Sequence, residues 1–179
     1  ERTSTTVIDV YLKPRIDDYL TSLESGLQKR GNPNLLIMRS NGGVMTTSSA
    51  REQPVTMIQS GPAGGVIASL HIGRLLAIDP LMTADIGGTS FDTSLIEDGQ
   101  PSTTGTTELE FGMPISTPML DIRSVGAGGG SLAWIDSAGI MKVGPESAGA
   151  IPGPACYGRG GITATSTDAN VVLGRLDPD

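Results

Sequence analysis

The chain contains 179 residues, of which 37% are hydrophobic and 3% aromatic, with 25 glycines, 12 prolines and one cysteine. A single cysteine excludes a disulfide scaffold, and glycines without a three-residue period exclude collagen. The net charge of −7 argues against nucleic-acid binding, which needs a basic face, and no apolar run is long enough to cross a bilayer. We therefore expect a soluble, cytoplasmic protein with an aliphatic core.

Glycines and acidic residues are concentrated in the later part of the chain. Residues 1–53 contain 4 glycines and residues 54–179 contain 21. The same later part carries 13 Asp and Glu against 5 Lys and Arg. Because each ordered glycine costs conformational entropy, so many of them need a structural or functional reason.

The first part of the chain is predicted to open with a helix. Apolar residues recur at three- and four-residue steps over residues 14–30, which favours a helix with Pro14 in its first turn. We then expect a strand at residues 34–40 and a second short strand at 55–58. A glycine-rich turn is expected at 60–65, followed by a buried helix at 66–76.

From residue 81 onward the pattern changes to strands. Residues 82–86 and 91–97 predict two strands around a glycine pair, and Asp98-Gly99 marks another hairpin turn. Further strands are expected at 106–111, 117–124 and 131–135, an ordered Gly- and Pro-rich loop at 144–161, and a last helix at 167–176.

The strongest chemical signal is Asp85-Ile86-Gly87-Gly88-Thr89-Ser90-Phe91-Asp92. A glycine pair between two strands lets the backbone come very close to a bound group, and the turn amides can form a nest for an anion. Asp85 at the strand end could hold Mg²⁺ or its water. The alternative is a plain hairpin turn with a solvated aspartate.

Other segments allow both a functional and a structural interpretation. Ser60–Gly65 could offer helix N-terminal amides to a phosphate or form only a tight turn, and Gly126–Gly130 could wrap a substrate or only connect strands. Arg39 could meet a phosphate or carboxylate, or form a salt bridge at a strand end. We expect Cys156 to be a buried structural thiol, and no Cys/His cluster predicts zinc.

Six motifs together resemble the hydantoinase A / 5-oxoprolinase family, in its central conserved domain. The resemblance extends over nearly the whole chain, and six ordered motifs are far more specific than any one of them. The motifs are RSNGG at 39–43, SGPAGG at 60–65, DIGGTSFD at 85–92, SVGAGGG at 124–130, GPACYGRGG at 153–161 and TDANVVLGRL at 167–176.

The resemblance implies a fold. The expected class is α/β, an ATPase domain of the ribonuclease-H-like type found in actin, sugar kinases and Hsp70, with a mixed sheet and flanking helices. Such proteins clamp ATP between two Asp–Gly hairpins, of which residues 85–92 match the second. The chain, residues 1–179, is therefore expected to be a single domain or a part of this domain, with flanking parts of the subunit absent.

The resemblance also implies an activity. Members use ATP and Mg²⁺ to open a cyclic amide or imide, phosphorylating the carbonyl oxygen so that water can attack. Two alternatives stay open: an ATP-dependent ketone carboxylase of the acetone or acetophenone type, and a non-catalytic structural piece. The expected partners are a cyclic amide or imide, the rest of the subunit and a second subunit of the hydantoinase B type, without nucleic acid or membrane.

The site residues follow from matching these motifs to the family. Asp85 is expected to organise the metal, and either Asp92 or Asp121 to act as general base. The expected nucleotide-binding residues are Gly87, Gly88, Thr89 and Ser90, with Gly64 and Gly65. Weaker candidates for contact with substrate or a neighbouring domain are Arg39, Asn41, Asp121, Gly128 and Gly129.

Overall fold

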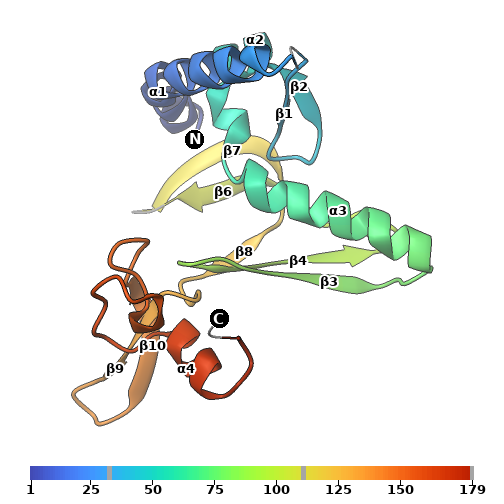
Figure 1. Ribbon diagram of the computed structural model, residues 1–179. Coiled ribbons are helices and arrows are strands. Elements are labelled where there is room, and N and C mark those ends of the chain that lie inside the picture. Colours follow the sequence, from blue (N-terminus) through green and yellow to red (C-terminus); the bar gives the residue numbers. More distant parts are fainter. Residues whose placement is uncertain (32–33, 110–111, 178–179) are drawn as a thin grey trace. The chain divides into compact units, whose positions relative to one another are not determined.

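The computed structural model describes residues 1–31, 34–109 and 112–177. The chain has an α/β fold and divides into two compact units (Figure 1). Unit 1 contains Glu1–Thr83 and Ser94–Ile122, and unit 2 contains Ala84–Thr93 and Arg123–Asp179. We describe each unit by itself.

Unit 1 opens with a long helix, α1 (Arg2–Lys29). The predicted helix is confirmed, but it begins twelve residues earlier than Pro14, which lies inside it. Ile8 explains the difference, because it packs in a buried cluster with Val55 and stabilises the turns that precede the proline. The Thr5 hydroxyl also accepts a hydrogen bond from the amide of Ser116, which ties this end of the helix to a strand of the same unit.

A short hairpin and two small helices follow. Strands β1 (Leu36–Met38) and β2 (Val44–Thr46) pair in antiparallel register, so the strand expected at 34–40 is shorter than predicted. Helix α2 (Thr47–Glu52) is capped by Thr46, whose hydroxyl accepts a hydrogen bond from the amide of Ser49.

The strand predicted at 55–58 is wrong. The 3₁₀ helix η1 (Pro54–Met57) occupies this place, and Pro54 stands at its first turn. The side chain of Asp9 accepts a hydrogen bond from the amide of Val55, which is buried against α1. Four largely apolar residues, with one threonine among them, carry no period that distinguishes a strand from a short helix, and contact with α1 decides the outcome.

The glycine-rich turn predicted at 60–65 is also wrong. These residues form the first turns of helix α3 (Ser60–Leu76), so the helix expected at 66–76 begins six residues earlier. The chain bends instead at Gln59, whose φ of 60° is left-handed. Ala63, Val66 and Leu70 share one buried face of the helix, and this spacing continues through the glycines.

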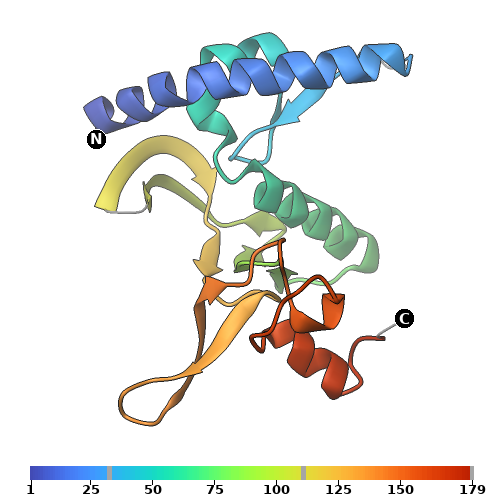
Figure 2. The same cartoon turned by 60° about the vertical axis from the view of Figure 1, so that its left-hand side comes forward.

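Unit 1 is completed by strands. Strands β6 (Thr103–Leu109) and β7 (Met113–Leu120) form a curved antiparallel pair (Figure 2). Strand β5 (Gln100–Pro101) pairs with the end of β4 (Phe91–Glu97) across the predicted Asp98-Gly99 turn. The strand expected at 106–111 begins earlier, at Thr103, and residues 110–111 lie outside the described part of the chain. The single strand expected at 117–124 is interrupted at residues 121–122, so that it is divided between β7 and a separate strand, β8 (Arg123–Val125).

The predicted hairpin of 82–86 and 91–97 is confirmed as β3 (Leu81–Ile86) and β4, and residues 84–93 of it belong to unit 2. In unit 2, β8 (Arg123–Val125) pairs with β4. Strands β9 (Ser131–Ile135) and β10 (Met141–Ser147) form a second hairpin around a turn at 137–139. The loop that follows contains the 3₁₀ helix η3 (Ala155–Tyr157), and the last helix, α4 (Ser166–Val172), is shorter than predicted.

The sheets differ from the expected mixed sheet. Every strand pair with a described register is antiparallel, and the strands form several small sheets. Short turns between consecutive strands require this arrangement, because parallel pairs need a long crossover. Within the described ranges, no helix is long and apolar enough to cross a membrane.

Candidate functional site

The tip of the β3–β4 hairpin exposes backbone amides. The amide of Gly87 donates to the carbonyl of Ser90 at 2.9 Å, which closes the turn. Among the hydrogen bonds of the described residues, none has the amide of Gly88 or Thr89 as its donor. A Cβ atom at Gly88 would have no atom within 4 Å, so the tip is open on that side. The hairpin therefore offers free N–H groups, as an anion-binding turn requires.

The glycine-rich segment 126–130 packs directly against this hairpin. The amide of Gly129 donates to the carbonyl of Gly87 at 2.9 Å, and the amide of Gly130 donates to the carbonyl of Gly88 at 2.7 Å. Gly128 lies so close that a Cβ atom there would be 2.7 Å from the Gly87 oxygen. Glycine is required because backbone meets backbone, and these contacts fix the peptide planes of the hairpin.

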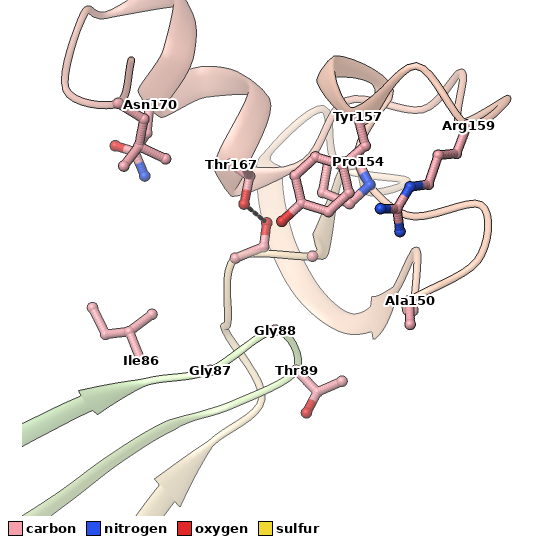
Figure 3. Close-up of a pocket in the computed structure, with 14 residues that line it drawn as sticks. Ile86, Gly87, Gly88, Thr89, Ala150, Pro154, Tyr157, Arg159, Thr167 and Asn170 are labelled. Carbon is pink, nitrogen blue, oxygen red and sulfur yellow. Dashed lines mark hydrogen bonds between the residues drawn. The ribbon is translucent and has the colours of Figure 1, made fainter. Parts of the chain in front are cut away.

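Helix α4 packs against the other side of the same segment. The amide and the hydroxyl of Thr167 each donate to the carbonyl of Gly129 at 2.8 Å, and Figure 3 shows the hydroxyl contact as a dashed line. A Cβ atom at Gly129 would lie 2.8 Å from the Thr167 hydroxyl oxygen. The hairpin, the glycine-rich segment and α4 thus form one hydrogen-bonded stack.

Asp168 connects α4 to the loop that carries η3. Its carboxylate accepts hydrogen bonds from the amide of Cys156 at 2.7 Å, the amide of Ala155 at 3.3 Å, and both the amide and the hydroxyl of Thr165. The bond from the amide of Thr165, together with the bond that the amide of Asp168 donates to the hydroxyl of Thr165, forms a capping box at the start of this helix. Burial disfavours the charged carboxylate, but these donors outweigh it and hold the pKa of Asp168 well below its usual value.

The expectation that Cys156 is buried is wrong. Its side chain is exposed, and its hydrogen bond to the charged Asp168 raises the pKa of the thiol, with a smaller contribution from burial. The loop is ordered through the backbone instead of through an apolar anchor, since Ile151 is 87% exposed and Tyr157 is 52% exposed.

A cavity of about 730 Å³ lies among these elements, wholly within unit 2 (Figure 3). The hairpin tip forms one wall, and α4 and the loop after β10 form the others. Its lining residues are Ile86, Gly87, Gly88, Thr89, Gly129, Gly130, Gly149, Ala150, Pro154, Tyr157, Arg159, Thr167, Asn170 and Leu176. Arg159 is the one charged residue among them, and its guanidinium lies 5.8 Å from the centroid of the Tyr157 ring.

Four of the predicted site residues line this cavity: Gly87, Gly88, Thr89 and Gly129. Asp85 does not, because side chains alternate along a strand and its neighbour Ile86 faces the cavity. The Asp85 side chain is exposed.

Ser90, Asp92 and Gly128 support the hairpin from outside the cavity lining. Asp92 accepts hydrogen bonds from the hydroxyl of Ser90 at 3.2 Å and from that of Ser124. The carboxylate therefore holds β4 and β8 together beside the turn.

The remaining predicted residues lie in unit 1. Gly64 and Gly65 are past the first four positions of α3, so their amides belong to the helical hydrogen-bond pattern and are not the free amides of a turn. The other three are Arg39, Asn41 and Asp121.

Two of these three shape the β1–β2 turn. The side-chain oxygen of Asn41 accepts a hydrogen bond from the amide of Gly43, whose carbonyl accepts one from the amide of Arg39. The Nε atom of Arg39 is buried and, within the described part of the chain, has no hydrogen-bond partner. The amide of Asp121 donates to the carbonyl of Ser102.

Sequence reasoning missed the wall opposite the hairpin. Tyr157, Arg159 and Asn170 stand in two of the quoted motifs, which the residues alone identified only as a loop and a helix. An aromatic residue and an arginine among glycines and prolines were the available signal. In the described ranges, no group of three or more His, Cys, Asp or Glu side chains is placed to hold a metal ion.

Comparisons with known proteins agree over nearly the whole chain. The chain is 41% identical over 176 residues to caprolactamase subunit alpha of Pseudomonas jessenii, covering 98% of this chain and 25% of that protein. It is 42% identical over 181 residues to 5-oxoprolinase of Saccharomyces cerevisiae, covering 99% of this chain and 14% of that protein.

Solved structures give the same result. The structure resembles nucleotide-free acetone carboxylase with a TM-score of 0.78 and 33% identity, over 89% of this chain and 22% of that one. It also resembles the ATP-dependent caprolactamase of Pseudomonas jessenii with a TM-score of 0.74 and 41% identity, over 98% of this chain and 26% of that one.

The chain spans roughly a quarter or less of the two curated relatives described above, 25% and 14% of their lengths. The hydantoinase/oxoprolinase family profile matches residues 2–179, which is almost every residue present. This match, together with the identities above, confirms the resemblance noted in the six motifs. The chain belongs to the hydantoinase/oxoprolinase family.

Proposed function

We propose that the protein to which this chain belongs is an ATP-dependent cyclic amidohydrolase, and that unit 2 binds the phosphates of ATP. The observation that carries the proposal is the hairpin tip, where the amides of Gly88 and Thr89 donate to no described acceptor and adjoin a cavity of about 730 Å³. Free amides at a glycine turn favour an anion, and the relatives of this chain include a caprolactamase and a 5-oxoprolinase.

The hairpin supplies a rigid binding surface. Both carbonyls of the glycine pair accept hydrogen bonds from Gly129 and Gly130, so the turn cannot easily rotate when a phosphate approaches. Donors fixed before binding stabilise charge in the transition state without reorganising at that moment. The Thr89 hydroxyl adds a further donor beside the same cavity.

A magnesium ion fits the chemistry of this hairpin. Mg²⁺ usually keeps several waters and binds through one or two carboxylates together with substrate phosphates, so it does not need a cluster of protein ligands. Asp85 is exposed three residues before Gly88 but does not line the cavity, so we propose that it would hold the ion through bound water. The ion would neutralise phosphate charge when bound.

The proposed reaction activates an amide that is otherwise a poor electrophile. The carbonyl oxygen attacks the terminal phosphorus of ATP and ADP leaves. Water then adds to the carbonyl carbon, the ring C–N bond breaks, and a second water releases phosphate from the resulting acyl phosphate. Of the two aspartates considered as general base, Asp92 is our choice over Asp121, because Asp92 lies beside the hairpin in unit 2.

The complete protein is proposed to have a ribonuclease-H-like ATPase fold, in which a second Asp–Gly hairpin outside this chain completes the ATP clamp. A second subunit of the hydantoinase B type is the proposed partner, since the caprolactamase relative is itself named as a subunit. A cytoplasmic location is proposed because ATP is available there and the single cysteine requires no oxidising compartment.

The Asp85→Asn variant of the full-length subunit tests the role of the hairpin. We expect ATP turnover with its cyclic amide to fall by about an order of magnitude or more, as for loss of a key electrostatic group. The matched control is Asp98→Asn, which removes the charge of an exposed aspartate in the turn after β4. Unchanged turnover in Asp85→Asn would support a non-catalytic structural role.

Ketone carboxylation is the second candidate, favoured by the likeness to acetone carboxylase. It would use the same phosphate hairpin with a ketone enolate as the acceptor. Supplying the complete enzyme with ATP and either caprolactam, 5-oxoproline or a hydantoin, or with acetone and bicarbonate, separates the two. Formation of ADP only with ketone and bicarbonate would contradict the amidohydrolase proposal.

A further inference from the structure

The cavity of unit 2 has a second polar wall facing the hairpin. The loop after β10 contributes Tyr157 and Arg159, and α4 contributes Thr167 and Asn170. In Figure 3 these four side chains lie on one side of the cavity, and Gly88 lies on the other. A ligand between the two walls would therefore meet backbone amides on one side and side chains on the other.

Arg159 gives this wall its charge. Among the described residues that line the cavity it is the one with a charge, in a chain whose net charge is −7. Among the described residues, none forms a hydrogen bond or an ion pair with its guanidinium. The guanidinium does make a cation–π contact, at 5.8 Å from the centroid of the Tyr157 ring. A guanidinium with no carboxylate partner at a cavity has all its donors available for an oxyanion.

The loop that carries Arg159 is held in place. Asp168 accepts hydrogen bonds from the amides of Ala155 and Cys156, which are four and three residues before the arginine. Contact with the Tyr157 ring further restricts where the guanidinium can lie. Asp168 belongs to α4, and Thr167 in the same helix contacts Gly129 of the segment behind the hairpin. The two walls are thus joined through one set of hydrogen bonds.

We propose that Arg159 recognises the phosphate groups of the nucleotide from the wall opposite the Gly88 hairpin. The inference rests on the proposed function and extends it by naming the side chain that neutralises the ligand. Phosphate is favoured over a substrate carboxylate because the same cavity contains the free amides of Gly88 and Thr89. Arginine suits this role because its planar fork binds phosphate through two parallel N–H groups.

The test is the affinity of the full-length subunit for the non-hydrolysable analogue AMP-PNP, measured by calorimetry in wild type and three variants. We expect Arg159→Gln to weaken binding roughly ten- to a hundredfold, and Arg159→Lys to weaken it less because the charge is kept. Arg175→Gln is the matched control, since it removes the same charge from an exposed arginine of unit 2 that does not line the cavity. Binding by Arg159→Gln should also depend less on salt concentration.

Four results would overturn the inference. Wild-type affinity in Arg159→Gln, combined with a raised KM for 5-oxoproline but not for uncharged caprolactam, would assign the arginine to a substrate carboxylate. An equal loss in Arg175→Gln would indicate a general charge effect. If Gly128→Ala abolishes AMP-PNP binding and Arg159→Gln does not affect it, the proposed function stands and the role of Arg159 fails. If the unaltered subunit binds no AMP-PNP, both fail.

Discussion

Units 1 and 2 are stabilised in different ways. All the buried hydrophobic side chains among the described residues lie in unit 1, where all but Met119 belong to three clusters. The residues buried in unit 2 are small or polar, including Gly128, Gly130, Ser131, Gly153 and Thr165. Unit 1 is therefore organised by aliphatic packing, and unit 2 by backbone hydrogen bonds between glycine-rich segments.

The difference explains where the candidate site lies. An aliphatic core tolerates exchange of one apolar side chain for another of similar volume, but contacts between backbones leave no room for any side chain. A site made of backbone amides is rigid and holds its donors in fixed positions, so a single added methyl group can disturb it. We expect substitutions in unit 1 to reduce stability and substitutions in unit 2 to reduce ligand binding.

The largest effect on stability is expected in unit 1. Leu20 is fully buried against Ile37 and Ala50, and Leu20→Ala should lower the free energy of local unfolding by about 2 to 5 kcal/mol. Hydrogen exchange across α1 in the full-length subunit measures this change. Val10→Ala, at a position 59% exposed on the same helix, should have little effect. A large loss of nucleotide affinity in Leu20→Ala, while the amides of α1 remain protected from exchange, would contradict the proposed difference between the two units.

We expect Gly128→Ala to change the free energy of unfolding less than Leu20→Ala does, but to reduce activity more. The new methyl group would lie 2.7 Å from the Gly87 oxygen, so the hairpin must move. A displacement of this kind can cost roughly a hundredfold in activity, and we expect that loss in kcat/KM for ATP.

The control for this variant is a glycine of unit 1. At Gly26 in α1 a Cβ atom would meet nothing within 4 Å, so Gly26→Ala should leave activity unchanged and stabilise the helix by up to about 1 kcal/mol. Equal activity in the two variants would show that the close approach of Gly128 to the hairpin is unimportant.

The smallest effect is expected at Asp168. Asp168→Asn weakens the bonds to the amides of Cys156 and Thr165, and we expect AMP-PNP affinity to fall several-fold because the wall carrying Arg159 loosens. Asp136→Asn is the control, since Asp136 accepts the amides of Ala138 and Ile140 in a turn away from the cavity.

The pH dependence of this contact has a defined sign. The pKa of Asp168 is lower in the folded chain than its ordinary value of 3.8, so the charged form stabilises the fold. This stabilisation is fully present above the ordinary value and is lost as the pH falls below it. Exchange protection of the Cys156 amide should therefore decrease below about pH 4 in wild type, and Asp168→Asn should not show this decrease. A decrease of equal size in both proteins would contradict the assignment.

The hairpin was predictable from the sequence, because its signal is local. Two apolar strands flank Gly87-Gly88, and a glycine pair there predicts a turn whatever the rest of the chain does. The segments at 55–58 and 60–65 were not predictable in the same way. Contact with α1 turns the first into a 3₁₀ helix, and burial of Ala63 draws the second into α3.

The opposite wall of the cavity could not be read from local patterns. Arg159 faces the cavity because Asp168 holds the preceding loop and Thr167 holds α4 against Gly129. These contacts join residues 12 and 38 positions apart in the chain. Spacing in a single sequence does not reveal such pairs, and motif order indicated only that the segments belong to one family.

Hydrogen exchange of the full-length subunit with and without AMP-PNP tests the central claim most directly, that the hairpin amides of unit 2 bind the phosphates. We predict that the nucleotide protects residues 86–90 and 157–159 and leaves residues 60–65 of α3 unchanged. Protection at 60–65 without any change at 86–90 would contradict the account.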